Sequence, residues 1–217
     1  MQNTITALTT QKRNPNRVNI FLDGEFSFGL YIINAGHLKV GQTISQEMID
    51  SLKKNDQIEE GFQKALKYIS FKPRTTFEVV KKLKENDFEE DIISLVLEML
   101  VEKGYVNDLE YAKNWVENRS VYKPRSKKLI TWELKNKKIS EDIISEVTGE
   151  MISEEELAIL AAEKYARRLS GYEKEVFFQR LSGYLIRRGF SYSTVNSTVQ
   201  TIWNIHRQQT YENSNGK

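Results

Sequence analysis

The sequence repeats with a period of 51 residues, and this period limits the possible folds more than any other feature. A step of 51 residues carries Leu83 to Leu134 and then to Leu185, and it carries the segment 71–75 to the similar segment 122–126. A fixed period of this length indicates one supersecondary unit repeated along the chain. We therefore expect three tandem repeats that stack into an elongated array and share apolar faces with their neighbours.

Each repeat has the apolar spacing of three helices. In repeat 1, Phe62 and Leu66 are four residues apart on one helical face, and Pro73 ends this first helix because proline disfavours helical backbone in the residue before it. Thr75 and Glu78 have the spacing of a capping box, which opens the second helix. Ser126 is the equivalent cap in repeat 2, Ser140 opens the third helix of that repeat, and Ser153 opens repeat 3.

The first 55 residues differ from the rest of the chain. Residues 5–10 and 18–22 are β-type segments, and Asp23-Gly24 between the second of them and residues 25–30 is a strong hairpin signal. We expect a small module of three strands, followed by a capped helix that begins at Ser45 and a separate first helix of repeat 1 at about 58–69. The predicted fold class is mostly α, with a small N-terminal β-rich segment.

The predicted organisation of the chain has five parts. They are a β-hairpin-containing segment at 1–55, helical repeats at 56–107, 108–152 and 153–210, and a disordered tail at 211–217.

Composition excludes several classes of protein. No run of 18 or more apolar residues is present, so we expect no membrane span, and the N-terminus lacks the pattern of a secretory signal. The absence of cysteine excludes disulfides and thiol chemistry and suits a reducing compartment. These features predict a cytoplasmic protein, and we expect it to be a monomer without a cofactor.

No motif of an enzyme active site is present. The histidines, His37 and His206, are far apart in the sequence and lack a metal-ligand partner at helical spacing, and no phosphate-binding glycine loop or nucleophile motif occurs. Glu78 is explained by its capping box. We therefore expect a protein that is not an enzyme.

The net charge of +2 conceals an alternation of charge with the repeat. Residues 72–84 hold five bases against one acid, whereas 85–102 hold seven acids and no base. In the second copy, 112–140 hold nine bases against two acids, and 141–156 again hold seven acids and no base. Such blocks either form ordinary solvated helix faces or align the first halves of the repeats into a basic stripe.

The acidic third helices argue against binding of DNA through a helix–turn–helix motif. The second and third helices of each repeat resemble a helix–turn–helix motif, whose last helix would lie against DNA. In repeats 1 and 2 that helix is acidic and would repel phosphates, so only repeat 3, with Arg187 and Arg188, allows this mode.

The candidate contacts to a filament or to DNA are therefore the bases of the second helices and of the loops before them. They are Lys72, Arg74, Lys81, Lys82, Lys123, Arg125, Lys127, Lys128, Arg187 and Arg188. Each phosphate contact would add salt-dependent affinity that is independent of sequence. The neighbouring aromatic residues Phe71, Tyr122 and Tyr172 could stack on bases, but we expect them to pack the loop onto the first helix.

Three passages resemble a known family. They are ALKYISFKPRTTFEVVKKL at 65–83, GYVNDLEYA at 104–112 and RSKKLITWEL at 125–134. Together with the Asp23-Gly24 turn, they are similar to the RecX family of bacterial recombinase regulators over nearly the whole chain. One departure is Lys138, where relatives usually carry glycine, so this turn must either avoid positive φ or be strained.

The resemblance implies a non-enzymatic regulator of DNA recombination, DNA repair and the SOS response. Relatives bind the RecA recombinase along the groove of its filament on DNA and inhibit its activity. A protein that instead binds DNA directly, through repeat 3 or the basic stripe, is the alternative.

Overall fold

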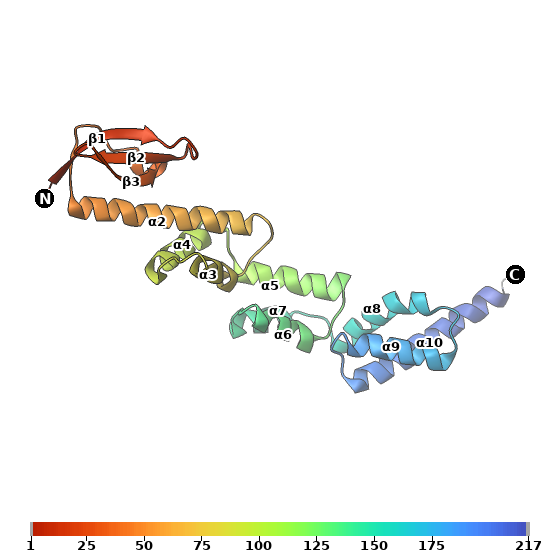
Figure 1. The fold of residues 1–217 in the computed structure, drawn as a ribbon. Coiled ribbons are helices and arrows are strands. Elements are labelled where there is room, and N and C mark those ends of the chain that lie inside the picture. The colour runs from red at the N-terminus through yellow and green to blue at the C-terminus, as the bar shows by residue number, and fades with distance from the viewer. Residues whose placement is uncertain (1, 216–217) are drawn as a thin grey trace. The chain divides into compact units, whose positions relative to one another are not determined.

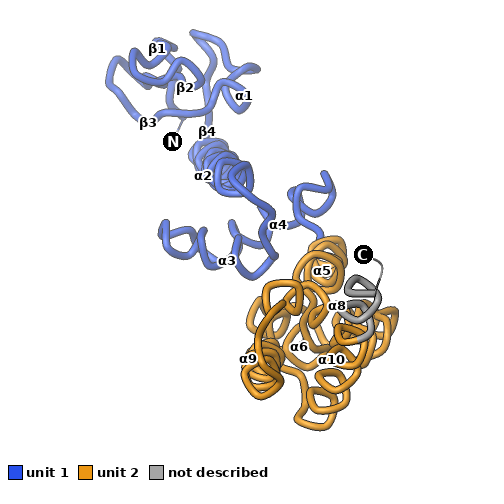
Figure 2. Tube along the Cα trace, turned by 90° about the vertical axis from the view of Figure 1, so that its right-hand side faces the viewer, with its two compact units in different colours: residues 1–107 blue, residues 108–217 orange. Residues whose placement is uncertain are grey.

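A computed structural model describes the backbone of residues 2–215 and the side chains of residues 2–207 (Figure 1). The chain forms two compact units, Met1–Asn107 and Asp108–Lys217 (Figure 2). The division falls at the position where the sequence places the start of repeat 2. Within the described residues, no helix is both long enough and apolar enough to cross a membrane.

Unit 1 begins with a small antiparallel sheet. Its strands are β1 (Gln2–Thr10), β2 (Arg17–Leu22), β3 (Glu25–Tyr31) and β4 (Thr43–Ser45), in the order β3-β2-β1-β4. Asp23 and Gly24, with φ of 50° and 91°, form the predicted turn between β2 and β3, since a two-residue hairpin of this type needs positive φ at both positions. Strand β4 was missed, because three residues are too few to show an alternating pattern.

One helix supports both the sheet and repeat 1. After the short helix α1 (Ile32–Ala35), helix α2 runs without a break from Gln46 to Ile69. The prediction of two separate helices here was wrong, because the chain between them contains neither proline nor glycine. The N-terminal half of α2 buries Ile49 against the sheet and the C-terminal half buries Phe62 against repeat 1. The predicted boundary between the β-rich segment and repeat 1 therefore falls within α2, where the helix stops packing against the sheet and starts packing against repeat 1.

A buried ion pair ties the sheet to α2. The Asp56 carboxylate, on α2, accepts hydrogen bonds from Arg17 Nη2 at 2.6 Å and from the Tyr31 backbone N–H at 2.5 Å. The Arg17 guanidinium also lies 4.6 Å from the centroid of the Tyr31 ring. Burial is the largest single influence and acts to lower the pKa of Arg17, but the charge and hydrogen bond of Asp56, together with Tyr31, outweigh it and the pKa is raised.

The remaining helices follow the predicted repeats. Repeat 1 is completed by α3 (Thr76–Lys84) and α4 (Glu90–Glu102). Repeat 2 holds α5 (Asp108–Glu117), a π-helical segment η1 (Asn118–Tyr122), α6 (Lys127–Asn136) and α7 (Glu141–Gly149). Repeat 3 holds α8 (Glu154–Ala166), a 3-10 turn η2 (Arg167–Leu169), α9 (Lys174–Ile186) and α10 (Tyr192–Asn215).

The end of α10 lies where the sequence predicts a disordered tail. Residues 211–215 belong to this helix, and residues 216–217 of the predicted tail lie outside the described residues.

The predicted helix caps are present. Thr75 and Glu78 form a reciprocal capping box at the start of α3, and Ser153 and Glu156 form another at α8. The hydroxyl of Ser126 accepts the N–H of the third residue of α6, and Ser140 does the same at α7. These side chains satisfy N–H groups that a helix leaves unpaired at its start, so they determine where each helix begins.

Each repeat encloses a hydrophobic cluster of its own. Val79, Leu83 and Val96 are buried together in repeat 1, Ile130 and Leu134 in repeat 2, and Leu181 and Leu185 in repeat 3. In unit 2, Met151 is the partly buried residue that packs against both the repeat 2 and the repeat 3 clusters. Repeats 2 and 3 therefore bury mainly separate clusters, and the apolar contact between these clusters is made at Met151.

The turn between the second and third helices has the same backbone geometry in every repeat. Asp87, Lys138 and Gly189 are spaced by 51 residues and have φ of 60°, 58° and 87°. Lys138 therefore adopts positive φ, a conformation that places the Cβ of an L-residue too close to the backbone carbonyl. The repeat retains the turn at a cost in backbone strain.

Replacing Asp56 by alanine should lower the free energy of unfolding of the sheet by about 3 kcal/mol, because it leaves the half-buried Arg17 charge and the Tyr31 N–H without their acceptor. Hydrogen exchange of the β2 and β3 amides measures this loss. Asp50→Ala, which removes an exposed carboxylate from the same helix, is the control and should change little. Equal exchange in the two variants would show that the ion pair does not hold the sheet.

Replacing Lys138 by glycine should raise the free energy of unfolding of unit 2 by about 1 kcal/mol, because glycine adopts positive φ without strain. Urea unfolding followed by tryptophan fluorescence suits the measurement, since the three tryptophans all lie in unit 2. The control is Lys137→Gly, at φ of −81°, which should lower stability. A destabilised Lys138→Gly variant would contradict strain at this turn.

Candidate interaction surface

The ten candidate cations divide into exposed residues and residues held by internal contacts. Those with exposed side chains are Lys72, Lys81, Lys123, Lys128 and Arg187. Lys82 is partly exposed and lies 3.4 Å from Glu85. Lys72, Arg74, Lys81 and Lys82 belong to unit 1, and the other six candidates belong to unit 2.

Arg74 is a packing residue of repeat 1. Its side chain is 14% exposed, and its guanidinium lies 3.8 Å from the centroid of the Tyr68 ring and 3.9 Å from the Glu78 carboxylate. An arginine stacked in this way holds the loop against the end of α2. The Arg74 guanidinium therefore makes contacts within the protein and presents little surface to a partner.

Lys127 joins repeat 2 to repeat 3. Its backbone N–H donates to the Glu154 carboxylate at 3.0 Å, and its Nζ donates to the Met151 carbonyl at 3.1 Å. These contacts tie the first turn of α6 to the start of α8. Lys127 therefore contributes to the junction between the two repeats.

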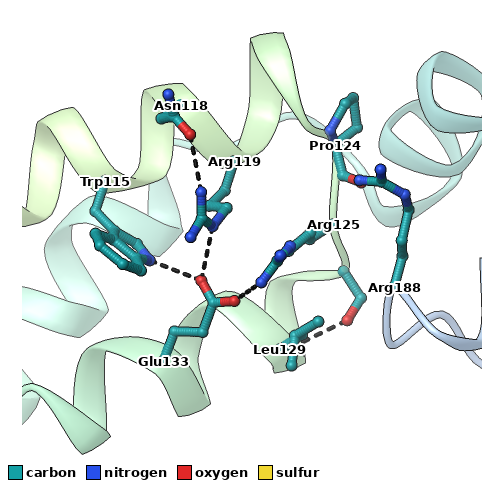
Figure 3. Close-up of polar contacts among 9 residues, drawn as sticks. Trp115, Asn118, Arg119, Pro124, Arg125, Leu129, Glu133 and Arg188 are labelled. Atoms are coloured by element: carbon teal, nitrogen blue, oxygen red, sulfur yellow. Dashed lines mark hydrogen bonds and ion pairs between the residues drawn. The ribbon is translucent and has the colours of Figure 1, made fainter. Parts of the chain in front are cut away.

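Arg125 is one of three donors that surround a single carboxylate (Figure 3). The Glu133 side chain on α6 is 10% exposed and forms an ion pair with Arg125. It also accepts from Trp115 Nε1 at 2.8 Å and from Arg119 Nε at 2.9 Å. Glu133 thus connects α6 to the end of α5, to η1 and to the loop that precedes α6.

Arg188 lies beside the same loop but has a different partner (Figure 3). Its Nη1 donates to the Pro124 carbonyl at 2.8 Å, and its own carbonyl accepts the Ser126 N–H at 3.0 Å. Its guanidinium also lies 4.5 Å from the Tyr184 ring. These contacts fix the turn after α9 against the cap of α6.

Two arginines, Arg119 and Arg125, therefore share the Glu133 carboxylate, and Arg188 bonds to the same loop at Pro124. Burial lowers the pKa of Arg125, and repulsion from Arg119 and Arg188 lowers it further. Burial is also the main cause of the lowered pKa of Arg119. Arginine stays protonated at neutral pH, so this cluster retains an excess of positive charge.

The loop aromatic residues do not pack down as expected. Phe71 is 75% exposed, Tyr122 is 66% exposed and Tyr172 is 42% exposed. Phe71 and Tyr122 each precede an exposed lysine, whereas Tyr172 lies 4.6 Å from the Arg180 guanidinium. The expectation that these rings cover the first helices was wrong, because the loops turn them away from the clusters that the helices bury.

Sequence reasoning missed the Glu133 network and one exposed tryptophan. Glu133 is one of only two acids in the basic segment 112–140, and this isolation was the signal that it neutralises neighbouring arginines. Trp132, on α6, is 60% exposed, one helical turn after Lys128. Ile130 and Leu134, each two residues from Trp132, fill the cluster, so Trp132 lies on the other face of α6.

Four models of one protein family match successive parts of the chain. They describe the regulatory protein RecX N-terminal domain at residues 3–45 and the RecX first, second and third three-helix domains at residues 62–105, 107–147 and 153–199. The matched segments follow the sheet and the three repeats in order.

Curated relatives and a solved structure agree with these matches. A regulatory protein RecX of Clostridium perfringens is 32% identical, over 92% of this chain and 96% of the relative. Another, of Leuconostoc citreum, is 30% identical over 99% of this chain and 81% of the relative. A crystal structure of a regulatory protein RecX matches with a TM-score of 0.69 and 26% identity, over 90% of this chain and 98% of that one.

Charge reversal should separate the internal cations from the exposed ones. Arg125→Glu places a second carboxylate against Glu133, so we expect the free energy of unfolding of unit 2 to fall by about 2 kcal/mol. Lys128→Glu, three residues away, is the matched control and should leave stability unchanged because its side chain is exposed. Urea unfolding followed by tryptophan fluorescence compares them, and equal stability would show that Arg125 is not structural.

Proposed function

This chain belongs to the RecX family of regulatory proteins, and we propose on that basis that it binds a RecA recombinase filament on DNA and inhibits it. As a member of the family it has a regulatory role. The proposed action needs no catalysis by the chain itself and takes place in the cytoplasm. Its consequence would be to limit recombination, DNA repair and the SOS response.

The observation that carries the proposal is the exposed aromatic–lysine pair at equivalent loops of repeats 1 and 2. Phe71-Lys72 and Tyr122-Lys123 are 51 residues apart, and all four side chains are exposed. Exposed aromatic side chains beside cations are typical of binding surfaces, where the ring supplies contact area and the cation selects an acidic partner. Two equivalent pairs suit a partner that is itself periodic.

In each unit, further exposed cations lie on or next to the second helices. Lys81 lies on α3 and Lys128 on α6, which are the helices that follow the two aromatic–lysine pairs in the sequence. Arg187 follows α9 in repeat 3. We propose that these residues face DNA or an acidic groove of the filament, and that Arg74, Arg125, Lys127 and Arg188 support the surface from within.

Direct binding to DNA is the second candidate. The exposure of Phe71 and Tyr122 favours it, because rings beside cations stack on unpaired bases while the cations contact phosphates. In this mode the chain would act on nucleic acid without the recombinase. Its affinity should fall steeply as salt rises.

DNA-dependent ATP hydrolysis by the cognate recombinase tests the proposal. We expect stoichiometric amounts of this protein to lower the rate, and the combined variant Lys72→Glu/Lys123→Glu/Lys128→Glu to require roughly ten times more protein for the same effect. The control is Lys12→Glu/Arg13→Glu, which reverses two exposed cations in the turn between β1 and β2. It should inhibit like the parent protein.

The same assay distinguishes the alternatives. An absence of inhibition at stoichiometric protein would reject the filament proposal. Binding to naked single-stranded DNA that is lost in Phe71→Ala/Tyr122→Ala, together with unchanged ATP hydrolysis, would favour direct DNA binding. Binding to DNA that does not weaken in high salt would contradict the role of the lysines in either mode.

A further inference from the structure

The contact loop of repeat 2, residues 118–126, carries the exposed aromatic–lysine pair of that repeat and is bonded to repeat 3 at two points. The Val121 carbonyl accepts a hydrogen bond from Lys164 Nζ, on α8, at 2.5 Å. The Pro124 carbonyl accepts one from Arg188 Nη1, in the turn after α9, at 2.8 Å (Figure 3). These two carbonyl groups directly precede and follow the exposed pair, so side chains of repeat 3 hold the backbone on both sides of it.

The start of α6 also depends on repeat 3. In repeat 1, the N–H of the cap residue Thr75 donates to Glu78 of the same capping box at 3.2 Å. The position equivalent to Glu78 in repeat 2 is Leu129, whose side chain cannot accept a hydrogen bond. The N–H of Ser126 instead donates to the Arg188 carbonyl at 3.0 Å. Repeat 3 thus replaces the half of the capping box that repeat 2 lacks.

The turn of repeat 3 approaches this cap so closely that a side chain at position 189 would collide with it. A Cβ atom on Gly189 would lie 2.5 Å from Ser126 Oγ and 2.8 Å from Leu129 Cβ. Positive φ does not by itself account for the glycine, since Asp87 and Lys138 adopt positive φ at the equivalent turns. The close contact between the turn and the start of α6 explains it.

The turn is itself fixed to the core of repeat 3. Phe190, which follows Gly189, is 4% exposed and belongs to the hydrophobic cluster of that repeat. The N–H groups of Arg188 and Gly189 donate to the carbonyls of Leu185 and Ile186, each at 2.9 Å. The contact loop is therefore bonded to a part of repeat 3 that is tied to the folded core.

We propose that Arg188 and Gly189 are positioning residues, which dock repeat 3 on repeat 2 and so hold Tyr122 and Lys123 in the conformation that binds the partner. Repeat 3 has Glu173 at the position equivalent to Tyr122, so its own loop does not repeat the aromatic–lysine pair. Its contribution at this surface is support. The proposal rests on the proposed function, because it explains how the contact residues of that function are presented.

Hydrogen exchange of the full chain tests the docking without the partner. Gly189→Ala should raise the exchange rates of the Lys123 and Ser126 amides about tenfold, because the added Cβ separates the turn from the cap. Gly171→Ala is the matched control, since Gly171 lies in the same repeat with the same φ of 87°, but a Cβ there would meet no group within 4 Å among the described residues. It should share the backbone strain and leave these two amides unchanged.

Inhibition of DNA-dependent ATP hydrolysis tests whether the docking affects function. We expect Gly189→Ala to require roughly five times more protein for equal inhibition, and Gly171→Ala to inhibit like the parent protein. In the Gly189→Ala background, Lys123→Glu should have no further effect, because this lysine is already displaced. Lys72→Glu, in unit 1, should weaken inhibition by the same factor in either background.

A second variant keeps the test available if Gly189→Ala does not fold. Arg188→Met removes the bond to Pro124 without adding an atom to the packed contact, and it should show the same non-additivity with Lys123→Glu. Its control is Arg180→Met, which removes an exposed arginine from α9 and should inhibit like the parent protein.

Two results would overturn the proposal. One is equal exchange of the contact-loop amides in Gly189→Ala and Gly171→Ala, and the other is an additive effect of Gly189→Ala and Lys123→Glu on inhibition. Failure of the proposed function gives a different result, because the parent protein would then not inhibit the recombinase at all. The partner-binding part of the proposal would fall with it, and amide exchange would decide whether repeat 3 holds the loop.

Discussion

The structure of unit 2 depends on the neutralisation of arginines by Glu133. This carboxylate receives Trp115 and Arg119 from α5 and η1 and Arg125 from the following loop, so it positions three segments of repeat 2 relative to α6. Removing such an acid would leave guanidinium groups facing one another in a partly buried site. Glu133 thus binds Arg119 and Arg125, which lie on either side of Tyr122 and Lys123 in the sequence.

Cations that look equivalent in the sequence therefore differ in the structure, since some make internal contacts and others are exposed to solvent. Arg125 and Arg188 bond to neighbouring groups of the protein, whereas Lys123 and Lys128 extend from the surface. Arginine suits the internal positions because its planar guanidinium forms several directed hydrogen bonds and stacks on aromatic rings. Lysine suits the exposed positions because its ammonium group is strongly hydrated and its stem is flexible.

The two repeats of unit 2 are joined by polar contacts as well as by apolar packing. Repeats 2 and 3 meet at Met151, which packs against both clusters, and through polar contacts. Lys164 and Arg188 donate to backbone carbonyl groups of repeat 2, and the Lys127 N–H donates to Glu154 of repeat 3. Polar junctions of this kind leave apolar side chains at the boundary partly uncovered.

The sequence by itself determined the number of repeats, the helix starts at Thr75, Ser126 and Ser153, and the hairpin at Asp23-Gly24, because caps, turns and helical spacing are local. It also indicated the RecX family, through similar passages distributed along the chain. Only the tertiary structure decided that α2 is continuous, that Phe71 is exposed, and which bases are internal. Those outcomes depend on contacts between residues that are far apart in the sequence. Whether a charged side chain faces the protein or the solvent is decided by the groups that the fold brings within its reach.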